Sequence, residues 1–232
     1  MVKGLTGHIA TALLGRLAAL TSLAFFLLSG TAFSEISVLT LNHQAEQVPL
    51  SSHIYYKEFK TSSESIDVLK LVPARGWKKL ELETANFGYT GSTYWFRINV
   101  LSPVQDSRWL IEVAYPVLDS IDFFAVSGDV VLEHATTGDH LHFDRRPLNH
   151  RNFVFSQDIK KGIPVSLFFK VTTTTSMQFP VVAWNERAFF LEDQRNLISL
   201  GLFYGAMLIM VFYNTFLFIA VRDRAYIVAG AK

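Results

Sequence analysis

Apolar and polar residues alternate with a period of two through the middle of the chain. In "TYWFRINV", residues 93–100, one face of a strand collects the apolar residues Tyr94, Phe96, Ile98 and Val100. The same alternation returns in "RWLIEVAY" and in "IPVSLFFKVTTTT", with Gly, Pro, Asn and Asp between the runs. Short strands at this spacing predict an all-β ectodomain, a jelly roll or sandwich, over residues 40–185.

The period becomes helical after this region. "NERAFFLEDQ" predicts a juxtamembrane helix over residues 186–195, with Asn185 as its N-cap. Residues 196–221, "NLISLGLFYGAMLIMVFYNTFLFIAV", contain no charge. A helix of this length spans about 39 Å, which suffices to cross a hydrocarbon core of about 30 Å with some tilt. We therefore predict a C-terminal transmembrane α-helix at 196–221, followed by a cytoplasmic end at 222–232.

The amino terminus has a different pattern. Lys3 and Arg16 are its only charges, and an apolar run from Leu17 to Leu28 leads to small residues near Ala32 and Ser34. This order predicts a secretory signal peptide over residues 1–34; the alternative is an uncleaved anchor, for which the run is short. With Arg222 and Arg224 just after the predicted span, residues 35–195 are expected outside the cytoplasmic membrane.

Composition removes several classes of function. The chain has no cysteine, so an exported domain must be held together by its core rather than by disulfides. Its formal charge of +1 does not favour nucleic acid as a partner. It contains no Gly-x-Ser-x-Gly elbow, no Walker loop and no dinucleotide-binding motif. We therefore expect a protein that is not an enzyme and uses no cofactor.

Five segments follow one another in a recognisable order: "GSTYWFRINV", "WLIEVAYPVLDSIDFF", "TGD…F..RP..HRNFVF", "FPVVAW" and "GLFYGAMLIMVFYNTFLFIAVRDRAY". Over residues 45–232 the chain resembles bacterial seven-transmembrane receptors with diverse intracellular signalling modules. The exported part is similar to their type-2 extracellular domain, and the apolar segment to the first helix of their seven-helix region. The resemblance implies a jelly roll related to carbohydrate-binding modules, located on the periplasmic side of the bacterial cytoplasmic membrane.

The same resemblance sets the expected function. Receptors of this family continue into further membrane helices and an output domain, whereas this sequence stops at Lys232. We expect a ligand-sensing periplasmic domain of a receptor truncated after its first membrane helix. Its partners would be a small-molecule or carbohydrate ligand and the membrane. The alternative is a membrane-tethered carbohydrate-binding or adhesive module without a signalling role.

One group of candidate ligand residues lies on the polar face of the strand at 93–100. Trp95 could stack on a sugar ring, while Arg97 and Asn99 could bond to hydroxyl or carboxylate groups. The alternative, which the residues favour, places Trp95 in a second layer of the sandwich core. Arg97 would then be neutralised by Glu112 on a neighbouring strand.

A second group lies in "TGDHLHFDRRPLNHRNFVF", residues 137–155. His140 and His142 would point the same way on a strand and form, with a carboxylate, a weak candidate for a metal site. The resemblance covers Asp139, Arg146 and His150 but neither His140 nor His142, which argues against a shared metal. We therefore predict a structured loop that borders a ligand surface, with Asp139, Arg146 and His150 as candidate ligand-binding residues and no metal.

The membrane segment holds three further residues of interest. Gly201 and Gly205 form a Gly-x-x-x-Gly face that would let another helix approach closely, either a helix partner in the bilayer or a second copy of this chain. Asn214 is a strongly polar side chain deep in the segment, where an amide normally faces protein or water. The alternative for all three residues is ordinary helix packing.

Overall fold

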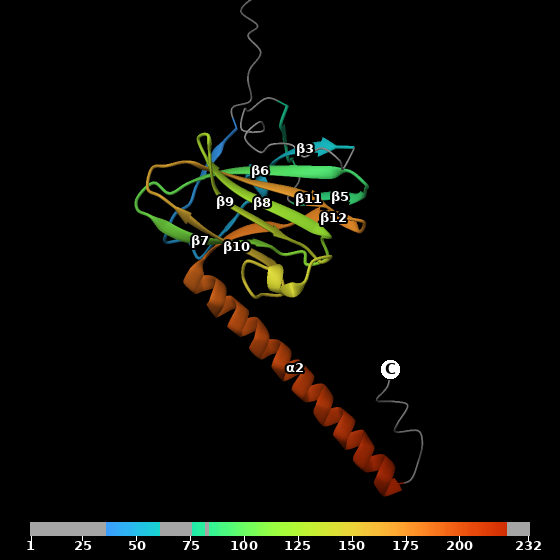
Figure 1. The fold of residues 1–232 in the computed structure, drawn as a ribbon. Helices are drawn as coiled ribbons and strands as arrows, with labels where there is room; N and C mark the ends of the chain where they lie inside the picture. Colours follow the sequence, from blue (N-terminus) through green and yellow to red (C-terminus); the bar gives the residue numbers. More distant parts are fainter. Residues whose placement is uncertain (1–35, 61–75, 82–83, 222–232) are drawn as a thin grey trace, which may run out of the picture. The chain divides into compact units, whose positions relative to one another are not determined.

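A computed structural model describes residues 36–60, 76–81 and 84–221 (Figure 1). The predicted signal peptide at 1–34 and the predicted cytoplasmic end at 222–232 lie outside the described residues.

Most of the described strands form two sheets. The larger has seven strands in the order β4-β3-β6-β11-β8-β9, with β1 beside β6, and the smaller has the order β10-β7-β13-β2. A separate pair joins β12 to β5. The bounds in the larger sheet are β1 Val38–Thr40, β3 Tyr55–Phe59, β4 Lys78–Lys79, β6 Thr93–Leu101, β8 Ser120–Ser127, β9 Val130–Thr137 and β11 Val165–Thr172. The remaining bounds are β2 Gln47–Pro49, β5 Ala85–Tyr89, β7 Ser107–Val113, β10 Phe153–Ile159, β12 Ser176–Phe179 and β13 Val181–Asn185.

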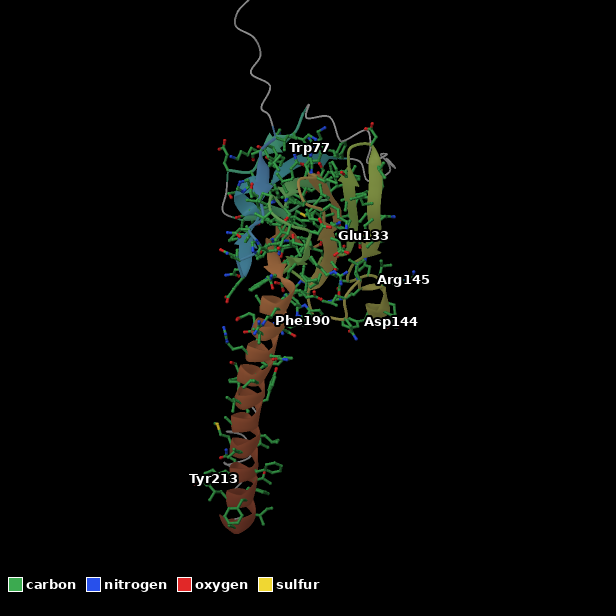
Figure 2. All side chains as sticks on the ribbon, turned by 90° about the vertical axis from the view of Figure 1, so that its left-hand side faces the viewer. Trp77, Glu133, Asp144, Arg145, Phe190 and Tyr213 are labelled. Atoms are coloured by element: carbon green, nitrogen blue, oxygen red, sulfur yellow. The ribbon has the colours of Figure 1, made fainter. Side chains whose placement is uncertain are left out.

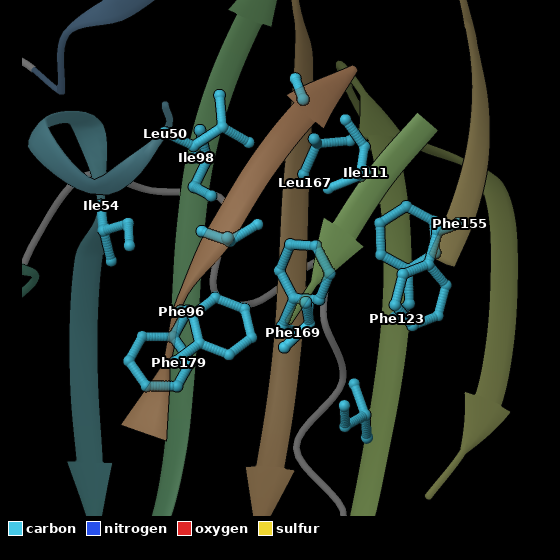
Figure 3. Close-up of a cluster of buried hydrophobic side chains, with 14 of the residues drawn as sticks. Leu50, Ile54, Phe96, Ile98, Ile111, Phe123, Phe155, Leu167, Phe169 and Phe179 are labelled. Atoms are coloured by element: carbon cyan, nitrogen blue, oxygen red, sulfur yellow. The ribbon is translucent and has the colours of Figure 1, made fainter. Parts of the chain in front are cut away.

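The core lies between the two sheets and combines aliphatic side chains with stacked phenylalanine pairs (Figure 3). Phe96 stacks on Phe179 with ring centroids 4.2 Å apart, and Phe123 stacks on Phe155 at 4.5 Å. These rings come from the inward positions of the alternating strands, as the period of two requires. The prediction of an all-β jelly-roll sandwich is confirmed, and its core forms without disulfides.

Among the described residues, the short 3-10 helices η1 (Ser51–His53) and η3 (Phe143–Arg145) lie in connections between strands. The chain then leaves β13 directly into α2, a continuous helix over Glu186–Val221. The Asn185 side chain accepts a hydrogen bond from the backbone N–H of Arg187 at 3.1 Å, which is the predicted cap.

Within the described part of the chain, α2 is long and apolar enough to cross a membrane. Side chains such as Phe190 and Tyr213 point away from its axis (Figure 2). Asn214 Nδ2 donates to the carbonyl of Met210 at 2.8 Å, so one N–H of its amide is bonded within the helix. A Cβ added at Gly201 or Gly205 would meet no described atom within 4 Å, and a packing role for this face stays a prediction.

Candidate functional site

The first group of predicted ligand residues lies on the outer face of the larger sheet, but it is covered. Trp95 is 1% exposed, and Arg97 and Asn99 are 6% and 8% exposed. Trp95 belongs to a second hydrophobic cluster that also contains Trp77 and Phe168. This is the second core layer that the sequence offered as the alternative, and a ligand role for these residues stays a prediction.

Arg97 is held by hydrogen bonds and rings on this face. Its Nε donates to Asn99 Oδ1 at 3.0 Å and its Nη2 to Ser166 Oγ at 3.3 Å. The guanidinium carbon lies 5.2 Å from the centroid of the Phe168 ring. Burial lowers the pKa of Arg97 to about 10, so the group is still charged at neutral pH.

Glu112 is not the partner of Arg97. It lies on β7, in the smaller sheet, where its two carboxylate oxygens accept from Asn152 Nδ2 at 2.7 Å and Trp184 Nε1 at 2.8 Å. The sequence-based pairing of Arg97 with Glu112 is therefore wrong, because β6 and β7 belong to opposite sheets.

A cavity of about 360 Å³ opens where the loops at one end of the sandwich meet. We call it the Asp119 pocket. Its walls come from the β5–β6 turn, the start of β8, the loop after β9 and the β11–β12 turn. The lining residues are Gly91, Ser92, Asp119, Ser120, His140, Leu141, Thr172, Thr173 and Thr174.

Asp119 is the organising residue of this pocket. One carboxylate oxygen accepts from the backbone N–H of Thr174 at 2.7 Å, and the other accepts from Thr173 Oγ1 at 3.4 Å. His140 Nε2 lies 3.6 Å from the same carboxylate, and its side chain is 67% exposed. The carboxylate is thus fixed by the β11–β12 turn, while the histidine above it is open to solvent.

The loop after β9 is tightly joined to Asp119 at its beginning. A Cβ at Gly138 would lie 2.1 Å from the carbonyl oxygen of Asp119, so only glycine fits here. The backbone N–H of Asp139 donates to Leu118 O at 2.8 Å, and that of His140 to Asp119 O at 3.3 Å. Asp139 therefore anchors the loop through its backbone, and it is the neighbouring His140 that lines the pocket.

His140 and His142 do not share a site. His142 Nδ1 lies 3.1 Å from the carboxylate of Asp144, and both side chains are exposed. Across residues 36–60, 76–81 and 84–221 no group of three or more His, Cys, Asp or Glu side chains could hold a metal ion.

Arg146 and His150, the other two predicted ligand residues, lie at the far end of the same loop. The Arg146 guanidinium lies 4.7 Å from the ring centroids of both Phe143 and Phe153. It donates to the carbonyl oxygens of His150, at 2.8 Å, and Arg151. Burial lowers the pKa of Arg146, an effect that Asp139 opposes. Neither Arg146 nor His150 lines the Asp119 pocket.

His150 is buried against the first turns of α2. Its Nδ1 accepts from the backbone N–H of Asn152 at 3.1 Å, which places the ring proton on Nε2. Nε2 then donates to Asp193 Oδ1 at 3.2 Å. Asp193 also forms a salt bridge with Arg151, N to O 3.0 Å. Two consecutive loop residues are thus bound to one helical carboxylate.

Phe189 completes this contact, and we call the whole contact the helix junction. Phe189 is 4% exposed and packs in a cluster with Leu110 and Val154, beside Leu148 and Trp184. It precedes Asp193 by four residues, so the two side chains leave the same face of α2. Sequence reasoning missed Asp119, Phe189 and Asp193; the i, i+4 spacing of the last two was the signal that could have found the junction.

The fold and its sites define a class of protein: a β-sandwich ectodomain joined to an apolar helix. The model of the family "7TMR-DISM extracellular 2" matches residues 51–185, more than half of the chain. The chain therefore belongs to the 7TMR-DISM extracellular 2 family. An extracellular domain followed by such a helix indicates a membrane-anchored protein with an outward-facing domain.

Comparison with individual proteins adds little to the family assignment. The solved structure of CsCBM6-3 from Clostridium stercorarium, in complex with cellobiose, matches 44% of this chain and 81% of its own at 12% identity, with a TM-score of 0.23. At this level the likeness supports no inference about a ligand. A search of curated proteins found no match.

Proposed function

We propose that this chain is the ligand-sensing part of a bacterial receptor, anchored in the cytoplasmic membrane with its sandwich in the periplasm. The ligand is a small polyhydroxylated molecule, of the size of a mono- or disaccharide, that binds in the Asp119 pocket. The extracellular-domain family and the apolar helix support the placement. The pocket supports the ligand class.

The observation that carries this proposal is the combination of groups around the cavity. Asp119 offers a fixed carboxylate, and each of its oxygens has a further lone pair for a ligand hydroxyl. His140 stands at the rim with its ring exposed. Leu141 and three consecutive threonines, residues 172–174, also line the cavity. A few fixed polar groups in a partly apolar concavity are typical of small-ligand sites.

The outer face of β6 supports binding less well, because a ligand could reach Trp95 only if its cover moved. The second candidate function is a tethered sugar-binding module that does not signal. It would use the same pocket and differs only in whether occupancy of the pocket affects α2.

Calorimetry on the full chain in lipid nanodiscs tests the proposal, with glucose and cellobiose as probes. Asp119→Asn should weaken binding by roughly tenfold or more, the value of a hydrogen bond to a charged group, and His140→Ala should weaken it by a smaller factor. His142→Ala is the matched control, because His142 is in the same loop but outside the pocket. A chelator should have no effect.

Three results would contradict this assignment. If neither sugar binds at millimolar concentration, the proposed class of ligand is wrong. If His140→Ala and His142→Ala weaken binding equally, the Asp119 pocket is not the binding site. Loss of binding on adding a chelator would favour the metal site instead.

Membrane placement has a separate test. Alkaline phosphatase fused after residue 190 should be active, because the enzyme works only outside the cytoplasm, whereas a cytoplasmic reporter at the same position should be silent. The reverse pattern would overturn the proposed orientation.

A further inference from the structure

The loop after β9 contacts both the Asp119 pocket and α2. We call residues 138–151 the strap. It begins at Gly138, which packs against the backbone of Asp119, and it reaches the pocket with His140 and Leu141. It ends at Arg151, whose guanidinium pairs with Asp193. Its tip carries η3, where the side chains of Asp144 and Arg145 are exposed (Figure 2).

The end of the strap nearest the pocket is packed tightly against Asp119. The carbonyl of Asp119 lies where a Cβ of residue 138 would be, and its oxygen also accepts the N–H of His140. The Asp119 side chain also holds the β11–β12 turn, because its carboxylate accepts the backbone N–H of Thr174. A shift of Asp119 must therefore move both the turn and the start of the strap.

The middle of the strap is closed on itself by Arg146. Its guanidinium lies against the rings of Phe143 and Phe153 and donates to two consecutive carbonyls, those of His150 and Arg151. Charge-assisted hydrogen bonds of this kind are about twice as strong as neutral ones, so the Arg146 side chain links Phe143 firmly to residues 150 and 151.

The helix end is bound on one face of α2. Asp193 accepts from His150 and Arg151, and Phe189 is buried one turn earlier. Glu112 joins Asn152, just past the strap, to Trp184, just before the helix. A rotation of α2 about its axis would break these contacts together, because a packed buried cluster does not deform continuously.

We infer that the strap couples the Asp119 pocket to helix α2, with Gly138 and Arg146 in the strap and Asp193 on α2 as the positioning residues. A change at the pocket reaches the helix through the strap, and a change at the helix reaches the pocket by the same route. This coupling goes beyond ligand binding, and it exists whatever the ligand is.

Hydrogen exchange of the full chain in nanodiscs, followed by mass spectrometry without any ligand, tests the coupling. The reporter is the amide of Thr174, which is bonded to Asp119 and belongs to neither the strap nor the junction. Coupling is reciprocal, so Asp193→Asn should speed exchange of this amide by at least about fivefold, the lower end of typical allosteric couplings. Arg151→Gln, which leaves the His150 bond in place, should produce a smaller change in the same direction.

Two controls make the result specific. Asp158→Asn breaks an exposed pair with Arg108 that is not part of the strap, and exchange at Thr174 should not change. In an Arg146→Gln background, Asp193→Asn should lose most of its effect on Thr174, because the strap is no longer closed. Peptides from β6 report whether the sandwich as a whole has loosened.

The inference is overturned if Asp193→Asn and Arg151→Gln speed exchange in residues 186–195 and leave Thr174 unchanged. It is equally overturned if Thr174 changes only together with β6 in both variants. Because no sugar is used, failure of the sugar titrations and failure of the coupling are separate results.

Discussion

The outer face of β6 and the loop after β9 both carry the aromatic, cationic and amide side chains from which ligand sites are made. On β6 these groups bond to other residues of the protein: Arg97 donates to Asn99 and Ser166 and is covered by aromatic rings. In the loop the two histidines differ in exposure: His140 is open to solvent at the pocket, whereas His150 is buried against α2. The comparison shows that residue chemistry identifies groups able to bind, and that burial decides which of them can meet a ligand.

Truncation of Trp95 should have the largest effect. Trp95→Ala should lower the free energy of unfolding of the sandwich by about 3–5 kcal/mol, because a large buried side chain leaves a cavity. Tyr89→Ala, at a ring that is 85% exposed, should change it little. Urea unfolding followed by near-ultraviolet circular dichroism measures both. A stable Trp95→Ala protein that has lost sugar binding would make β6 the ligand face after all.

The helix junction should show the next largest effect. Phe189→Ala should lower the free energy of unfolding of the sandwich by about 2–4 kcal/mol, because the loss of a buried ring leaves a cavity that its neighbours fill only in part. The adjacent Phe190, 44% exposed, is the matched control, and Phe190→Ala should stay within about 0.5 kcal/mol. The same urea experiment applies. Equal costs for the two variants would mean that α2 is not docked through Phe189.

Within the loop, Arg146→Gln should have a moderate effect. It removes two hydrogen bonds from a cation and its contacts with two rings, for an expected cost of about 1–3 kcal/mol. Arg145→Gln, at the neighbouring exposed position, should be close to neutral. Thermal unfolding distinguishes them. If Arg145 and Arg146 behave alike, the loop is held by its backbone alone.

The smallest effect is expected for Asp158. The hydrogen bond from Arg108 lowers the pKa of Asp158, so the pair is complete at neutral pH and weakens as the pH falls through that lowered pKa. Both side chains are more than half exposed, and solvent screens such pairs. Asp158→Asn should therefore leave the unfolding midpoint nearly unchanged at neutral pH. A large shift would show that surface charge contributes more to this end of the sandwich than burial indicates.

Much of the architecture could be predicted from the sequence because it depends on local period. The alternation at 93–100 determined which residues of β6 face the core, and the charge-free run at 196–221 determined an apolar helix. Glu112 shows the limit. Its position on a strand was predictable, but its partner was not, since adjacent strands in the sequence lie in different sheets.

By itself the sequence determined the strands, the long helix, the cap at Asn185 and the family resemblance, since each of these depends on neighbouring residues or on residue order. Only the tertiary structure decided that Trp95 and Arg97 are covered, that Asp119 organises a pocket, and that His150 and Arg151 bind Asp193. His150 and Asp193 are 43 residues apart in the chain. No local sequence pattern can predict a contact between residues so far apart in the chain, because the contact arises when the loop, the sheet and the helix pack together.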